Sequence, residues 1–417
     1  MMNYIQFFQA SKWFISLLGM LLIPTMTFAQ HVKSLAIDAD GNAWIHRSEL
    51  AVNAMSIKAD ESSLGQIEII TSNGSYSLSR DEHVLQTGTV VQSNLIVFDK
   101  PVYRIEMNGL KRGIKVEIFL ISLPETLKHK AAVSLRTDCG QPEMISQEDW
   151  RSGLPEPVYD RIFNTVNNII LHHSATSNTI TDYTNLVRSI YTYHTQVNGW
   201  SDIGYNYLVA PDGTIYAGRD PGTGMETDEV LGAHFCASNT GTMGICLLGT
   251  FMDQPPTTDA IQSLTELLVW KMAKDSLPPL ATHQHPLNEH LGVLAGHRDG
   301  CSTLCPGDAV FQSLGEYRQQ SKLKLEACGI FLNLPEVDLS GSLTGLFPNP
   351  SHGDYLYYNT KTAPLAVRLI GMDGRLWNCR VEHQGELLTI HVPFPPAVYI
   401  FEMITKHGVY RQSVVIN

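Results

Sequence analysis

The sequence has no run rich in lysine and arginine, and its 29 basic residues are outnumbered by 41 acidic ones. The net charge of −12 excludes a basic nucleic-acid-binding surface and gives no attraction to anionic membranes. Beyond the N-terminus there is no apolar stretch long enough to span a bilayer, no internal repeat and no low-complexity linker. The 417 residues, 43% of them hydrophobic, are enough for two or three packed domains.

Residues 1–29 have the layout of a secretory signal peptide. One lysine, Lys12, precedes an apolar run at about residues 13–23, and Thr-Phe-Ala supplies a small-residue cleavage site before Gln30. The run is shorter than the roughly 20 residues that a spanning helix needs, which favours export over a membrane anchor. Export would place the cysteines in an oxidising compartment, where disulfides form.

Two β-rich segments flank the middle of the chain. Residues 30–138 contain short runs such as IEIITSNGSYSLS and IKVEIFLISL between Asn-Gly and Asp-Gly turn formers, which predicts an all-β domain, a small antiparallel sandwich of unknown role. Residues 340–417 predict a second small β-sandwich, with a hairpin signal at Met372-Asp373-Gly374.

Residues 139–330 alternate strand-like and helix-like stretches, which predicts an α/β domain with a central mixed β-sheet flanked by helices. NIILH, MGICLLGTF and VLAGH are expected to be short buried strands, and Pro-Asp-Gly at residues 211–213 predicts a hairpin. Helical spacing predicts one helix over about residues 182–197, and Thr257-Thr258 is expected to open another that ends near Lys274.

The stretch GHRDGCSTLCPGD, residues 296–308, puts one histidine and two cysteines close together in a chain of only 7 cysteines. The cluster indicates either a disulfide or one edge of a metal site. His172 and His297 each end an expected strand, where loops of an α/β sheet can build a site. Together with Cys305 they make a good zinc set, and three protein ligands leave a fourth position for water.

Other histidines compete for such a role. Alternation along a strand lets only one of His172 and His173 face the metal, and the pattern does not say which. His194 is expected to pack at a helix end. The remaining candidates lie in a stretch more typical of solvated loop residues, and they are His283, His285 and His290.

Four ordered blocks resemble the peptidoglycan recognition protein and type 2 N-acetylmuramoyl-L-alanine amidase family: IILHHSATSN, HTQVNGWSDIGYNYLVAPDGTIYAGRD, GAHFCASNTGTMGICLLGTF and LAGHRDGCSTLCPGD. The resemblance implies that His172, His297 and Cys305 bind Zn²⁺. It also implies a catalytic role for Tyr205, and an assisting role for Thr303, where members carry lysine or threonine.

The resemblance covers about residues 141–329 and implies a zinc amidase that cleaves between the lactyl group of N-acetylmuramic acid and L-alanine in peptidoglycan. Members that only bind peptidoglycan often have serine in place of Cys305. This residue therefore favours an enzyme over the alternative, a non-catalytic peptidoglycan-binding protein. A disulfide from Cys305 to Cys301 is the competing interpretation.

Further assignments concern the disulfides and the substrate contacts. Bridges Cys139–Cys328 and Cys236–Cys301 are hypotheses, since spacing does not fix pairing. Four residues are candidates for contacts with glycan or stem peptide, and they are His234, Trp200, Arg219 and Asn239. The alternative for each is a structural role, either in core packing or in hydrogen bonds that fix a loop.

The C-terminal segment resembles the sorting domain of type IX secretion cargo. The resemblance rests on three stretches, LFPNPSHGDYLYY, LIGMDGRL and VYRQSVVIN. The resemblance implies a Gram-negative bacterium, passage through the periplasm, a partner in the outer-membrane secretion machinery, and a final location in the medium or on the cell surface. A carbohydrate-binding module is the alternative for this domain. We expect a monomer whose partners are peptidoglycan or muropeptides, with no nucleic acid.

Overall fold

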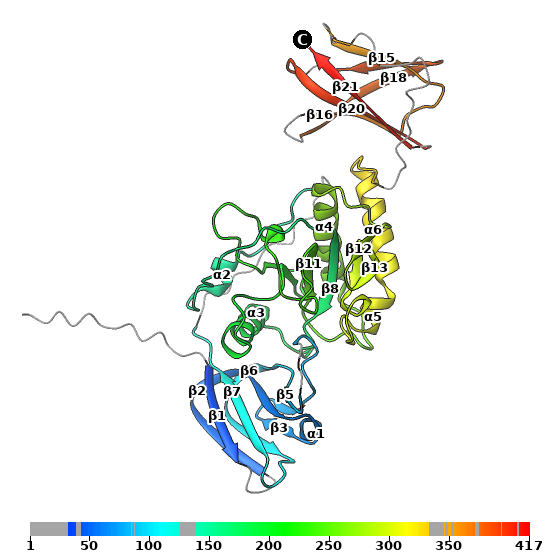
Figure 1. Ribbon diagram of the computed structural model, residues 1–417. Helices are drawn as coiled ribbons and strands as arrows, with labels where there is room; N and C mark the ends of the chain where they lie inside the picture. The colour runs from blue at the N-terminus through cyan, green and yellow to red at the C-terminus, as the bar shows by residue number, and fades with distance from the viewer. Residues whose placement is uncertain are drawn as a thin grey trace, which may run out of the picture. The chain divides into compact units, whose positions relative to one another are not determined.

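The computed structural model describes residues 32–38, 43–84, 86, 88–125, 139–332, 346, 349–351, 354–371, 375–392, 394–406 and 408–417. The predicted signal peptide and the predicted hairpin residues 372–374 lie outside the described residues. Within these ranges no helix is both long and apolar enough to cross a membrane. Figure 1 shows strands at both ends of the described chain and a mixed helical and stranded region between them.

The N-terminal domain is all-β and antiparallel, as expected. Its strands are hydrogen-bonded into one continuous sheet in the order β1-β7-β2-β6-β3-β4, with β5 pairing β2. The long strand β2 causes this, because Ala54 pairs with Val97 on one side and with Ile121 on the other. The elements are β1 (Val32–Asp38), β2 (Ala43–Asp60), α1 (Glu61–Leu64), β3 (Glu68–Thr71), β4 (Gly74–Ser77), β5 (Val90–Gln92), β6 (Ile96–Asn108) and β7 (Lys115–Ile121).

The middle domain is built on a five-stranded mixed sheet in the order β10-β9-β11-β8-β14. Strands β9, β11, β8 and β14 are parallel, and β10 runs antiparallel to β9. Leu171 pairs with Gly296, so the residues that follow these two positions leave the sheet at the same edge. The strands are β8 (Asn168–His173), β9 (Tyr207–Val209), β10 (Ile215–Ala217), β11 (Thr242–Leu247) and β14 (Leu294–Gly296).

Helices cover both faces of this sheet. Residues of α4 and α6 share one apolar cluster with Ile169 and Leu171, whereas residues of α3 share another with Leu208; Figure 1 shows α3 on one side of β8 and β11 and α6 on the other. The helices are α2 (Gln147–Arg151), α3 (Tyr183–Thr192), α4 (Thr258–Lys274), α5 (Asp308–Gln312) and α6 (Leu314–Ala327). The other elements here are η1 (Tyr193–Val197), η2 (Thr227–Glu229), η3 (His297–Asp299) and a hairpin of β12 (Thr282–His285) and β13 (Asn288–Gly292).

The two predicted helix starts are capped by side-chain hydrogen bonds. The Asp182 carboxylate accepts a hydrogen bond from the Asn185 amide and caps α3, and the Thr257 hydroxyl does the same for α4. The chain runs on from α3 into the π-helix η1, so the predicted span of residues 182–197 covers both. A disulfide from Cys139 to Cys328 joins the two ends of this domain.

The C-terminal domain has two sheets, one ordered β15-β19-β18 and the other β17-β16-β20-β21. Both contribute to one apolar core, which includes Leu356, Leu369, Ile390 and Phe401. The strands are β15 (Tyr355–Asn359), β16 (Ala366–Gly371), β17 (Leu376–Asn378), β18 (Arg380–Gln384), β19 (Leu387–His391), β20 (Ala397–Thr405) and β21 (Gly408–Ile416).

Candidate functional site

Two histidines and one cysteine meet at the edge of the middle sheet. His172 lies at the end of β8, His297 directly follows β14, and Cys305 lies in the loop before α5. One nitrogen of each histidine and the cysteine sulfur all lie within 4.8 Å of one another. His172 Nδ1 is 3.6 Å from Cys305 Sγ, and all three side chains are buried.

This group fits a zinc ion. Zinc bonds of about 2.0–2.3 Å bring ligand atoms to within about 4 Å of one another, and the 3.6 Å between His172 Nδ1 and Cys305 Sγ matches this spacing. His297 Nδ1 is buried and has no hydrogen-bond partner among the described residues, as expected for an atom that faces a cation. Burial lowers the pKa of His172 and of His297 well below 6.5, so both imidazoles are neutral and can donate a lone pair.

The His172 ring is hydrogen-bonded to a second histidine through the nitrogen that does not face Cys305. His172 Nε2 lies 3.0 Å from His234 Nδ1, and His234 Nε2 lies 3.4 Å from the Thr242 hydroxyl. Gly244 makes room for this arrangement, because a Cβ there would lie 2.7 Å from the His234 ring. A hydrogen bond to the second nitrogen of a ligating histidine fixes the orientation of its ring.

Both histidines of the pair lie in a group of possible metal ligands, His172 with His297 and Cys305, and His173 with His83 and Cys305. The His172 ring lies 4.5 Å from the His297 ring, whereas His173 Nδ1 already accepts a hydrogen bond from the Phe251 amide at 3.5 Å, which favours His172 as the ligand. The backbone amide of His173 donates to Cys305 Sγ at 3.4 Å, which fixes the position of the sulfur beside β8.

The two residues expected to assist catalysis lie beside this group. The Tyr205 ring is 5.2 Å from the His172 ring, and burial raises the pKa of Tyr205 well above 10, so the phenol keeps its proton and can donate it in a hydrogen bond. The Thr303 hydroxyl accepts a hydrogen bond from the Cys305 amide at 3.0 Å, which fixes the loop that carries the sulfur.

The four predicted substrate contacts have local partners. Asn239 Oδ1 accepts hydrogen bonds from the amides of His234 and Phe235, and the Trp200 ring lies 4.5 Å from that of His194. Arg219 is buried with its guanidinium 5.4 Å from the centre of the Tyr159 ring. His234 lies behind His172. These positions favour structural roles, and a substrate contact at each stays a prediction.

The sulfur of Cys305 is not in a disulfide. Cys236 and Cys301 pair with each other, while Cys246, Cys305 and Cys379 are thiols. The competing bridge from Cys305 to Cys301 is therefore absent. The histidines at positions 283 and 290 are exposed on the β12–β13 hairpin, outside the metal-binding group.

A family model described as N-acetylmuramoyl-L-alanine amidase matches residues 163–308. Peptidoglycan recognition protein 1 of Bos taurus is 30% identical over 183 residues, which are 43% of this chain and 85% of that protein. The chain belongs to the peptidoglycan recognition protein and N-acetylmuramoyl-L-alanine amidase family.

Two amidases are among its relatives. N-acetylmuramoyl-L-alanine amidase of Homo sapiens is 34% identical over 137 residues, covering 32% of this chain and 21% of that protein. The solved structure of an endolysin N-acetylmuramoyl-L-alanine amidase from Clostridium intestinale is 25% identical and covers 43% of this chain and 96% of that one, with a TM-score of 0.33. The residues that the amidase model matches lie in the middle domain, which is named the amidase-family domain.

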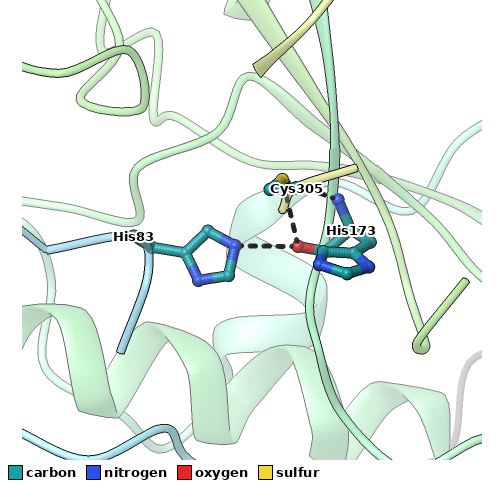
Figure 2. A group of neighbouring side chains, drawn as sticks. All are labelled: His83, His173 and Cys305. Carbon is teal, nitrogen blue, oxygen red and sulfur yellow. Dashed lines mark hydrogen bonds between the residues drawn. The ribbon is translucent and has the colours of Figure 1, made fainter. Parts of the chain in front are cut away.

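Residues of the N-terminal domain also reach this site, which the sequence does not predict. His83 Nε2–H donates to the His173 carbonyl oxygen at 3.0 Å, next to Cys305, as Figure 2 shows. Glu82 accepts hydrogen bonds from the Thr303 hydroxyl and the Leu304 amide, both at 2.8 Å. The one available signal was the titratable triplet Asp-Glu-His at residues 81–83, in a segment with few histidines.

Electrostatics at His83 are set by its partners. Burial disfavours its charged form, but hydrogen bonds with Asp81 and Cys305 outweigh this and raise the pKa of His83 well above 6.5. Asp81 Oδ1 accepts from the His83 amide at 2.8 Å and lies 3.2 Å from His83 Nδ1. Both ring nitrogens therefore face acceptors, the Asp81 carboxylate and the His173 carbonyl.

Proposed function

We propose that the protein is a zinc-dependent amidase that hydrolyses the bond between the lactyl group of N-acetylmuramic acid and L-alanine in peptidoglycan or its fragments. The observation that carries the proposal is the convergence of His172, His297 and Cys305 within 4.8 Å in a domain that the amidase model matches. A serine at position 305 would weaken the metal site, so the cysteine favours catalysis over binding alone.

The residues have separate tasks in this proposal. The chemistry that zinc supplies when bound is Lewis-acid polarisation of the amide carbonyl and a water with its pKa lowered towards about 7. His172, His297 and Cys305 hold the ion, and His234 keeps the His172 ring in its orientation. The protonated phenol of Tyr205 donates a hydrogen bond to the oxygen that gains charge during attack on the carbonyl.

Purified full-length protein incubated with a muramyl dipeptide tests the proposal. We expect free N-acetylmuramic acid and a peptide with a new L-alanine amine, both lost after metal removal and restored by zinc. Tyr205→Phe should lower the rate by roughly 100-fold, because one donor to the developing charge is removed. Binding of the muramyl dipeptide without any cleavage, by protein with a full complement of zinc and an accessible site, would favour the non-catalytic binding protein.

We also propose that the chain is exported and sorted by its C-terminal domain. The two disulfides support passage through an oxidising compartment. Protein recovered from the medium of a Gram-negative bacterium should begin at Gln30 and lack the residues from about 340 onwards, or carry an anchor there. An intact N-terminus in the recovered protein would contradict export by signal-peptide cleavage.

A further inference from the structure

We infer that the N-terminal β-domain is a built-in inhibitor of the amidase-family domain, with Glu82 and His83 as the residues that close the candidate site. These two residues, together with Asp81, are named the closing segment. The inference rests on the proposed function only in taking the group around Cys305 as the place where muramyl peptides bind.

The closing segment lies against the rings of the candidate site. The His83 ring is nearly parallel to the His297 ring at 6.2 Å and meets the Tyr205 ring edge-on at 6.5 Å. A substrate carbonyl that approached both His297 and Tyr205 from this side would therefore meet the His83 ring, whose side chain is only 13% exposed.

The closing segment also engages the residue expected to assist catalysis. The Glu82 carboxylate accepts from the Thr303 hydroxyl and the Leu304 amide, each at 2.8 Å. The Thr303 hydroxyl donates its hydrogen bond to Glu82, so it cannot donate to a substrate at the same time. A muramyl peptide would have to displace two hydrogen bonds to a charged group, which are stronger than neutral ones.

Little space remains beside the closing segment. The cavity that it forms with the amidase-family domain has a volume of about 60 Å³, far below the ~300 Å³ at which ligand pockets begin. On the amidase side this cavity is lined by residues that include Ser174, His194 and Tyr205. The cavity is too small to hold a muramyl dipeptide, and its lining includes Tyr205 but not His172, His297 or Cys305.

The closing segment belongs to a docked domain. Asp81 is buried and accepts a hydrogen bond of 2.6 Å from the hydroxyl of Tyr193, the first residue of η1. Thr179 donates to the Asp99 carboxylate at 2.9 Å further along the interface. Apolar residues of both domains share one cluster, and those of the β-domain are Val32, Ala54, Leu95, Val97 and Ile121. This packing holds the closing segment against the candidate site.

The test is the binding of muramyl dipeptide to metal-free, full-length protein, measured by calorimetry. The variant carries Glu82→Ala and His83→Ala, and the matched control carries Glu68→Ala and His46→Ala in the same domain, away from the site. We expect the affinity to rise at least about tenfold in the first variant, since two charge-assisted hydrogen bonds no longer oppose the ligand. The control should stay within about twofold of the unaltered protein.

Unchanged or weaker binding in a variant with an unaltered thermal unfolding temperature would overturn the inference, because the closing segment would then be neutral or part of the substrate site. Glu82→Gln, which keeps the side-chain volume, guards against misfolding and should raise the affinity several-fold. This readout requires neither zinc nor hydrolysis. A protein that binds muramyl dipeptide more tightly when opened but never cleaves it would support closure and refute the amidase proposal.

Discussion

His172 Nδ1 and Cys305 Sγ lie 3.6 Å apart although 133 positions separate the two residues. Parallel pairing of β8 with β14 produces this contact, because it delivers His172 and His297 to one edge of the sheet, where the following loop returns Cys305. Three donor atoms so placed account for the buried, unpartnered His297 Nδ1. The proposals about metal, catalysis and closure all depend on this contact.

Cys305→Ser should weaken zinc binding by at least about 100-fold, since a thiolate ligand is replaced by a poorly coordinating hydroxyl. Metal analysis after gel filtration is expected to find one zinc per chain in the unaltered protein and almost none in the variant. Cys379→Ser, a thiol in the C-terminal domain, is the matched control and should keep its zinc. Equal zinc in both variants would remove Cys305 from the metal site.

His234→Ala should lower zinc affinity by about 10- to 100-fold, because the His172 ring loses the hydrogen bond that orients it. Competition with a chromogenic chelator measures this change. His290→Ala, at an exposed position of the β12–β13 hairpin, is expected to leave the affinity unchanged. Equal zinc affinities in the two variants would show that His234 does not orient the His172 ring for metal binding.

The free energy of unfolding should fall as the pH is lowered from 6.5 towards 3, partly through His194. Burial lowers the pKa of His194 from 6.5 to about 3, and its Nδ1 accepts a hydrogen bond from the Gly204 amide. The unfolded chain therefore binds one more proton in this window, so stability is complete above pH 6.5 and is lost as the pH falls, by up to about 1.4 kcal/mol per pH unit.

Urea titrations at several pH values, in metal-free protein, test this dependence. His194→Gln should make the slope of stability against pH shallower by up to about one proton, whereas His290→Gln should not change it. An identical slope in the His194 variant would show that this imidazole is protonated in the folded state.

Replacing both Cys139 and Cys328 by serine should destabilise the amidase-family domain by roughly 2–5 kcal/mol, since the bridge closes a loop across 189 positions of sequence. The expected readout is a lower urea midpoint for the loss of domain signal. Cys246 is a buried thiol outside both bridges, so Cys246→Ser removes a buried sulfur without removing a crosslink. This control distinguishes the two contributions to the loss of stability.

Local patterns explain what could be predicted. Asp182 and Thr257 cap helices because their side chains accept backbone N–H groups, and this depends on a few neighbouring residues. The short apolar runs around His172 and His297 form the expected parallel strands. The candidate ligands were predicted from the two strand ends and the cysteine loop, and the choice of His172 over His173 from the family blocks, since alternation did not distinguish these two histidines.

Contacts between distant segments explain what could not be predicted. The role of His234 behind His172 depends on the space left at Gly244, a packing relationship that no local pattern encodes. Glu82 and His83 reach the site only because the β-domain docks on α3, and docking of two domains has no periodic signature. The single N-terminal sheet likewise depends on β2 pairing on both of its edges.

The most direct measurement is mass spectrometry of muramyl dipeptide after incubation with zinc-loaded and metal-stripped protein, using both the full-length chain and its Glu82→Ala, His83→Ala variant. We expect N-acetylmuramic acid and a peptide with a free L-alanine amine in the zinc-loaded samples, more of both with the variant, and neither product without metal. Intact substrate in every zinc-loaded sample, or equal cleavage with and without metal, would contradict a zinc-dependent amidase.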